Sequence, residues 1–177
     1  GNYIQEWYND KNSQETADIL NVSSGQTIGN IDAQLATGSI ISGRVTDVSG
    51  SGIPYVPAMA QELSDNSAHS STSDANGYYS ITGLSAGSYK VGFFTQNAGN
   101  YIAEWYNDKD SFENADTLLL AAKQTIGNID AQLAEGGIVS GHVTDESSNG
   151  IEGIDVYIYN LSYSNIVSTS TDSEGNY

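Results

Sequence analysis

Acidic side chains are the groups in this sequence best placed to do chemistry. Four of them lie close together, and they are Asp108, Asp110, Glu113 and Asp116. Carboxylate oxygens are the ligands that Ca²⁺ prefers in proteins, so this set is the candidate metal site of the chain. Their spacing is not that of an EF-hand, and a solvated acidic loop without metal is the alternative interpretation.

Catalysis by histidine or by paired carboxylates has little support in the sequence. The chain has two histidines, His69 and His142, and in the internal repeat described below their places are taken by valine and arginine. A general base that each copy needed would not be replaced in this way. Glu104 and Asp108 could form the acid and base pair of a glycosidase, but neighbouring carboxylates arise by chance in a chain with 22 acidic residues. We therefore expect no enzymatic activity, and no cofactor other than calcium.

Two tryptophans, each followed by a tyrosine, are candidates for stacking on a sugar ring. They are Trp7 and Trp105. The alternative is that Trp105 fills the hydrophobic core while Tyr106 covers an edge. A buried tryptophan removes about 150 Å² or more from water, which favours the core interpretation.

Composition excludes several classes of partner. The chain of 177 residues has 22 acidic and 5 basic residues, a net charge of -17 and an isoelectric point near 4.1. We expect no nucleic acid partner, because a polyanion repels another polyanion. The longest apolar run, 118–122, is far shorter than the roughly 20 residues that insert into a membrane. Hydrophobic residues make up 38% of the chain, enough for a folded core, and the absence of cysteine excludes disulfides.

The sequence repeats itself at an offset of 98 residues. Gly1–Ile4 returns as Gly99–Ile102, and the eleven residues Gln26–Ala36 return unchanged as Gln124–Ala134. About half of the comparable positions are identical, and no insertion is needed to align them. A period near 100 residues is the size of a domain, so each copy is expected to own a hydrophobic core.

Glycine-containing joints divide the chain into three parts. We expect a complete module at 38–135, preceded by the C-terminal part of another module at 1–37 and followed by the N-terminal part of a third at 136–177. One interpretation is that the chain is a piece of a longer tandem protein. The other is that partial modules of adjacent chains complete each other by strand exchange, since a partial module exposes unpaired strand edges.

Alternating apolar residues and turns every 8 to 12 residues predict an all-β fold of antiparallel, immunoglobulin-like or transthyretin-like sandwich modules in tandem. Pro54 and Pro57 place the second strand at a sheet edge, because proline cannot donate to a ladder. At most one helical turn is expected, around Ser111–Ala115. The remaining strands are predicted at 41–45, 69–73, 78–81, 89–95, 101–106, 118–120, 126–134 and 154–158.

Four motifs occur in order within one period: Gly38–Asp47, Thr72–Tyr79, Gly83–Val91 and Glu104–Asn107. Together they resemble the carboxypeptidase regulatory-like modules, which are transthyretin-like (prealbumin-like) β-sandwiches found in tandem in secreted and cell-surface prokaryotic proteins. The resemblance implies this fold and an extracellular or cell-surface location. It does not imply catalysis, because such modules serve as spacers, stalks or binding accessories.

These observations predict a non-enzymatic structural repeat that forms a rigid acidic stalk, fibre or filament. Its partners would be neighbouring copies of the same module, in the same chain or in an adjacent one. The joints are only two or three residues long, so the modules cannot tumble independently. The alternative function is a carbohydrate- or calcium-binding accessory module of a secreted enzyme or adhesin.

Overall fold

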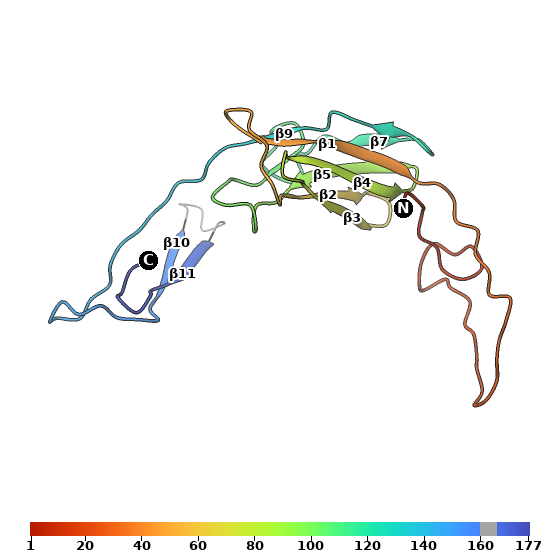
Figure 1. Cartoon of the computed structure of the whole chain (residues 1–177), viewed down its shortest axis with the longest axis horizontal. Helices are drawn as coiled ribbons and strands as arrows, with labels where there is room; N and C mark the ends of the chain where they lie inside the picture. Colours follow the sequence, from red (N-terminus) through yellow and green to blue (C-terminus); the bar gives the residue numbers. More distant parts are fainter. Residues whose placement is uncertain (160–165) are drawn as a thin grey trace. The chain divides into compact units, whose positions relative to one another are not determined.

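The computed structural model describes residues 1–159 and 166–177. These residues form strands and turns (Figure 1), which confirms the all-β class. The chain separates into two compact units, Gly1–Gly136 and Gly137–Tyr177, each described by itself below. The described residues contain no helix long and apolar enough to cross a membrane. That residues 38–135 are a complete module stays a prediction.

The first sheet of unit 1 is built around strand β1 (Ser39–Asp47). On one side β1 pairs antiparallel with β4 (Tyr78–Leu84), and it also pairs with β8 (Thr125–Ile126) and β9 (Ala131–Leu133) in parallel. The predicted antiparallel pairing holds for β1 with β4 and throughout the second sheet, but the pairings of β1 with β8 and β9 are parallel. The preceding strand, β7 (Leu118–Leu120), belongs to the other sheet. Between β7 and β8 the chain crosses to the first sheet, and β8 then runs in the same direction as β1.

The second sheet has the order β3-β2-β5-β6, with β7 also paired to β5. Its other strands are β2 (Pro57–Glu62), β3 (Ala68–Thr72), β5 (Gly87–Phe93) and β6 (Glu104–Trp105). The prediction that the proline-containing strand lies at an edge was wrong, because β2 pairs with β3 and with β5. Pro57 is the first residue of the strand, where its missing N–H breaks no ladder, and its carbonyl accepts a hydrogen bond from the Phe94 amide.

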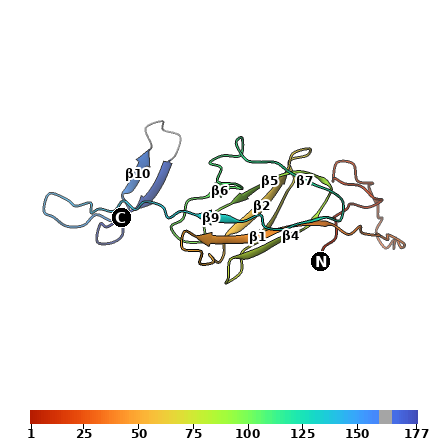
Figure 2. The ribbon, with the colours of Figure 1, turned by 90° about the horizontal axis from the view of Figure 1, so that it is seen from above.

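The two sheets enclose one hydrophobic core (Figure 2). Alternate residues of β1, β2, β4 and β5 point into it, as the period of two in a strand requires. The hydroxyl of Tyr79 reaches through the core and donates to the Ile129 carbonyl at 2.5 Å. The side chains that are almost completely buried include Ile41, Val45, Val56, Ile81, Leu84, Tyr89, Val91, Phe93, Leu120 and Leu133.

The predicted strand 126–134 is interrupted, and it forms the two short strands β8 and β9 instead. Asn128 lies between them with a φ of 60°. The chain bends there, and the Ile129 amide donates to the Ser42 carbonyl. Gly43 permits this approach, because a side chain at that position would collide with the Ile129 carbonyl. The helical turn expected at Ser111–Ala115 is a hydrogen-bonded turn rather than a helix.

The expected roles of Trp105 and Tyr106 are reversed. Trp105 pairs with Gly92 on the outer face of β5, and its ring packs edge-on against Phe94 and Phe112. The next residue, Tyr106, packs against the hydrophobic core. Successive strand residues face opposite sides of a sheet, so a prediction that is one residue out of register exchanges core and surface. Trp105 is therefore not the core plug that the sequence favoured.

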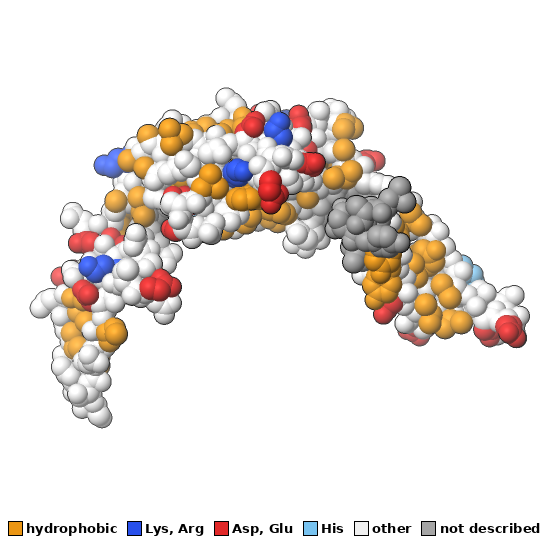
Figure 3. Space-filling model, turned by 180° about the vertical axis from the view of Figure 1, so that it is seen from behind, with side chains coloured by type: hydrophobic (Ala, Val, Ile, Leu, Met, Phe, Trp, Pro, Cys, Tyr) orange, Lys and Arg blue, Asp and Glu red, His pale blue; other side chains and the backbone are white. Residues whose placement is uncertain are grey.

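Unit 2 consists of a two-stranded antiparallel sheet and the segments around it. The sheet contains β10 (Asp155–Tyr159) and β11 (Ile166–Ser170). Figure 3 shows hydrophobic side chains gathered at the surface of this unit. Exposed apolar residues of the unit are Ile138, Val139, Ile154, Tyr157, Ile158, Tyr159 and Val167.

Adjacent leucines on β7 offer a matched test of the core. Leu120 is 1% exposed and Leu119 is 77% exposed. We expect Leu120→Ala to lower the free energy of unfolding by about 2–5 kcal/mol, since it removes buried surface and leaves a cavity. Leu119→Ala should change it by less than about 0.5 kcal/mol. Urea denaturation followed by fluorescence measures both, and equal losses would contradict the proposed strand register.

Candidate functional site

The acidic loop predicted to bind calcium follows strand β6. Asp108 lies in the tight turn that joins Trp105 to Lys109, with a φ of 57°. Asp116 accepts a hydrogen bond from the Asn107 amide group at 2.6 Å, and Asp110 accepts one from Asn114 at 3.0 Å. The Asn114 bond holds the pKa of Asp110 below its ordinary value.

The remaining candidate ligand, Glu113, is exposed, and its backbone carbonyl accepts a hydrogen bond from the Lys90 ammonium at 3.2 Å. Lys90 also lies 4.7 Å from the centroid of the Phe112 ring. A fixed positive charge beside the loop opposes a second cation. Within residues 1–159 and 166–177, no three acidic or histidine side chains gather closely enough to hold a metal ion. Calcium binding by the four predicted residues stays a prediction.

Glu104 and Asp108 influence each other electrostatically. Strand β6 places Glu104 opposite the buried Phe93, so its carboxyl group lies on the core side of the sheet. Burial raises the pKa of Glu104 to about 7, the negative charge of Asp108 adds to the rise, and a backbone hydrogen bond with Gln132 opposes it. A raised pKa beside a second carboxylate is also found in glycosidases, but here the register of β6 accounts for it.

The two histidines occupy different surroundings. A ring nitrogen of His142 lies 2.6 Å from the Glu174 carbonyl in unit 2. Arg44, which takes the same place one repeat earlier, donates from Nε to the Asn76 carbonyl at 2.9 Å. Both side chains thus support the same turn of the backbone. His69 lies elsewhere, in the wall of a pocket described below.

The best-defined polar site of unit 1 is the joint between residues 1–37 and the β-sandwich. Asn2 spans it with both ends of its side-chain amide. Its Nδ2 donates to the Gly38 carbonyl at 2.8 Å, and its Oδ1 accepts from the Gly83 amide at 2.8 Å. Gly38 returns a bond from its amide to the Asn2 carbonyl at 3.1 Å. One side chain therefore ties the N-terminal segment to the linker and to the turn between β4 and β5.

The joint is closed by glycines that let the backbone segments touch. A Cβ at Gly38 would lie 2.6 Å from the Gly83 Cα. Gly83 has a φ of 77°, and a Cβ there would lie 2.7 Å from the Tyr3 carbonyl oxygen. No other residue fits these positions without displacing the backbone. The repeated Gly-Asn-Tyr was a signal for this site in the sequence. It indicated the period of the repeat, but not that its asparagine holds a joint.

Hydrogen bonds at the joint recur 98 residues later. Asn100 donates from Nδ2 to the Gly136 carbonyl at 2.6 Å, and the Gly136 amide donates to the Asn100 carbonyl at 2.9 Å. The turn after each tryptophan also recurs, with Asn9 bonded to Asp18 as Asn107 is to Asp116. These two sets of hydrogen bonds therefore recur with the repeated sequence.

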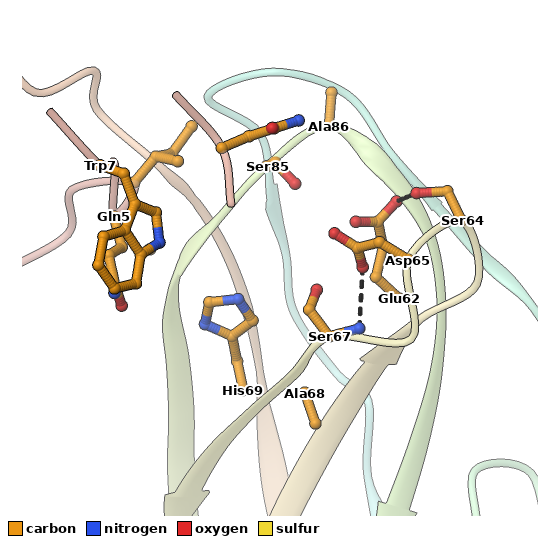
Figure 4. A pocket seen from close by; sticks show the side chains of 13 residues that line it. Gln5, Trp7, Glu62, Ser64, Asp65, Ser67, Ala68, His69, Ser85 and Ala86 are labelled. Atoms are coloured by element: carbon orange, nitrogen blue, oxygen red, sulfur yellow. Dashed lines mark hydrogen bonds between the residues drawn. The ribbon is translucent and has the colours of Figure 1, made fainter. Parts of the chain in front are cut away.

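A pocket of about 480 Å³ opens beside this joint (Figure 4). One wall comes from the N-terminal segment and includes Gln5 and Trp7. The opposite wall comes from β2, β3 and the loop between them. It includes Glu62, Asp65 and His69. The sequence did not predict this pocket, because its two walls are more than fifty residues apart in the chain.

Residues 40–104 match the carboxypeptidase regulatory-like domain. The resemblance based on the sequence motifs is therefore confirmed for this part of the chain. The match does not extend over the N-terminal wall of the pocket. No curated protein matches the chain.

Several solved structures have a similar fold. The TIE protein of Bacillus anthracis is 15% identical over 79% of this chain and 25% of its own, with a TM-score of 0.41. A streptococcal ancillary pilin is 11% identical over 78% of this chain and 48% of its own, with a TM-score of 0.44. The major pilin subunit of Bacillus cereus is 13% identical over 56% of this chain and 30% of its own, with a TM-score of 0.38. The chain thus spans between a quarter and about half of these proteins, and scores this low carry no functional argument.

Substitution of Asn2 tests whether its side chain holds the joint. Asn2→Ala removes the acceptor for the Gly83 amide, so we expect hydrogen exchange of that amide to accelerate about tenfold or more. Asn2→Asp keeps an oxygen at Oδ1 and should preserve the protection of Gly83 while losing the bond to the Gly38 carbonyl. Exchange measured by NMR distinguishes the two variants. Equal protection of Gly83 in both would contradict the role of Asn2.

Glu104 gives the pH dependence of stability a defined sign. The folded chain binds the proton of Glu104 more tightly than the unfolded chain does, because the pKa rises from 4.5 to about 7 on folding. Stability from this group is therefore greatest below pH 4.5 and falls as the pH rises to about 7. We expect Glu104→Gln to flatten this fall, as measured by urea denaturation between pH 4.5 and 8.

Among the described carboxyl groups with a shifted pKa, only Glu104 has a pKa raised into the window between pH 4.5 and about 7. The pKa values of the others are all lowered, so these groups titrate below that window; they are Glu15, Asp47, Asp65, Asp110, Asp145 and Asp172. Parallel stability curves for the variant and the unchanged chain would show that Glu104 is not the responsible group.

Proposed function

We propose that this chain is part of a non-enzymatic, extracellular structural protein in which β-sandwich modules follow one another as a rigid acidic stalk or filament. The observation that carries the proposal is the joint held by Asn2. Its side chain bridges the linker and the β4–β5 turn, so the segment before the sandwich is fixed to it by more than a flexible connection. A spacer needs such joints, because they fix the direction in which one module follows another.

Repetition of the joint supports a tandem arrangement with a 98-residue period. Asn100 bonds to Gly136 as Asn2 bonds to Gly38. The bonds between asparagine and the linker glycine thus recur, and a module held by them and by a contact like that of Asn2 with Gly83 would take the same orientation at every joint. Repeated identical joints build a regular rod or helix, in which contacts between neighbours provide much of the stability.

A non-catalytic role and a surface location are also supported by the domain family. Residues 40–104 are similar to the carboxypeptidase regulatory-like domain. The resemblance implies a spacer or binding accessory in a secreted or cell-surface protein. A net charge of -17 keeps adjacent stalks apart by mutual repulsion and limits unspecific association.

The segment Gln26–Ala36 supports neighbouring modules as partners. Its identical counterpart, Gln124–Ala134, lies along β1 and buries Ile129 and Leu133, which are 3% and 0% exposed. The corresponding side chains of the N-terminal segment, Ile31 and Leu35, are 41% and 45% exposed. The same eleven residues are thus docked once and undocked once within one chain.

A matching surface exists in unit 2. Ile138–Val143 corresponds in sequence to the first part of β1, and its exposed Val139 corresponds to the fully buried Ile41. We infer that Gln26–Ala36 of one copy docks on this segment of a second copy, as Gln124–Ala134 docks on β1. The docking segment and the segment that receives it are different parts of the chain. The contact is therefore head to tail and can continue into a filament.

Sedimentation velocity of the 177-residue chain over a range of concentrations tests this contact. We expect the sedimentation coefficient to rise with concentration. Leu35→Asp should abolish the rise, because it places a charge in the docked apolar face.

Val48→Asp is the matched control. Val48 is exposed, its counterpart in the other copy is already Glu146, and the substitution adds the same charge. Association unchanged by Leu35→Asp, or a chain that stays monomeric throughout, would rule out docking between chains. Saturable binding of calcium or a glycan by the same preparation would favour the accessory-module alternative.

A further inference from the structure

The pocket beside the joint contains a buried carboxyl group that no described lysine or arginine contacts. Glu62 is only 8% exposed, and its carboxylate accepts a hydrogen bond from the Ser64 hydroxyl at 2.6 Å. Gly87 makes room for it, because a Cβ at that position would lie 2.7 Å from Glu62 Oε1. None of the described lysine or arginine side chains pairs with this carboxylate. A buried carboxylate is costly unless a positive charge or several donors compensate it.

A second carboxylate shares this wall. Asp65 accepts a hydrogen bond from the Ser67 amide at 2.8 Å, and the Ser67 contacts hold its pKa below its ordinary value. Figure 4 shows the carboxyl groups of Glu62 and Asp65 next to each other at the pocket. Two adjacent carboxyl groups offer several oxygen acceptors to the N–H groups of a cation.

The opposite wall carries an aromatic ring. Trp7 lies across the opening from the two carboxylates, with Gln5 beside it (Figure 4). Trp7 is 38% exposed and lines the pocket. Its indole offers a broad apolar face to the carbon chain of a bound molecule.

The chemistry of the walls selects among possible cations. A divalent metal ion needs at least three converging ligands, and His69 does not complete such a set with the two carboxylates in the described structure. An organic cation needs only a charge partner and an apolar or aromatic surface for its carbon atoms, and the pocket offers both. A neutral sugar could stack on Trp7 but would bring no positive charge to Glu62 and Asp65.

We propose that this pocket binds an organic cation whose ammonium or guanidinium group pairs with Glu62 and Asp65 and whose carbon chain extends toward Trp7. The group can come from a lysine or arginine side chain of a protein or from a free amine. In the other copy, the places of Glu62 and Asp65 are taken by asparagine and tyrosine, so we expect one site per chain. This inference does not rest on the stalk function, because a pocket at the joint binds its ligand whether or not the chains assemble.

NMR titration of the full chain tests the proposal with two probes, 1,5-diaminopentane and a capped glycine–lysine–glycine peptide. The chain has two tryptophans, and Trp7→Phe assigns their indole N–H signals. We expect the Trp7 signal to shift in a saturable manner while the Trp105 signal stays in place as an internal reference. Titration in about 150 mM salt screens weak attraction of amines to the acidic surface.

Carboxamide variants identify the charge partners. Glu62→Gln and Asp65→Asn should each weaken binding about tenfold, since each removes one charge-assisted contact. Glu146→Gln replaces the same kind of carboxyl group at an exposed residue outside the pocket and should leave binding unchanged. Thermal unfolding shows whether the Glu62→Gln variant is folded. If it is not, Asp65→Asn alone tests the proposal, because Asp65 is exposed and its substitution leaves the core intact.

The outcomes separate the sources of the cation. Saturation by both probes supports recognition of the ammonium group itself, and saturation by the peptide alone supports a basic protein partner. Shifts of the Trp7 signal that are unsaturable, or that all three carboxamide variants reduce equally, would overturn the proposal. A shift caused by a neutral tetrasaccharide and by neither amine would replace it with a sugar site.

Discussion

Strand β5 imposes the constraint on which the rest of unit 1 depends. It pairs with β2 on one side and with β6 and β7 on the other, so it fixes the register of three strands at once. Its inward residues, Tyr89, Val91 and Phe93, are buried, and every residue opposite them is drawn toward the core. Glu104 lies opposite Phe93, and this position explains why its carboxyl group holds its proton unusually well.

The same constraint separates the two aromatic residues after Glu104. Trp105 is opposite Gly92 and joins Phe94 and Phe112 on the outer face, whereas Tyr106 reaches the core. The outer cluster also receives the ammonium of Lys90. Aromatic packing outside the sheet therefore anchors the acidic loop, which gives that loop a structural purpose independent of any metal.

At the other end of the sandwich, polar contacts replace apolar packing. The joint is held by the amide of Asn2 and by close contact of Gly38 with Gly83. Directional hydrogen bonds define an orientation in a way that apolar contacts do not. The pocket next to the joint exists because this orientation brings Trp7 to face Glu62 and Asp65. Stiffness of the joint and definition of the pocket thus have one cause.

The sequence by itself determined the all-β class, the period of 98 residues and the domain family, because strand alternation, turn residues and self-similarity are local or directly comparable features. It did not determine the parallel pairing of β1, the interior place of β2, the outward direction of Trp105 or the pocket at the joint. Each of these depends on which strand lies beside which, and on its register. Both are settled by long-range packing: a shift of one residue exchanges the faces of a strand and leaves its local pattern unchanged.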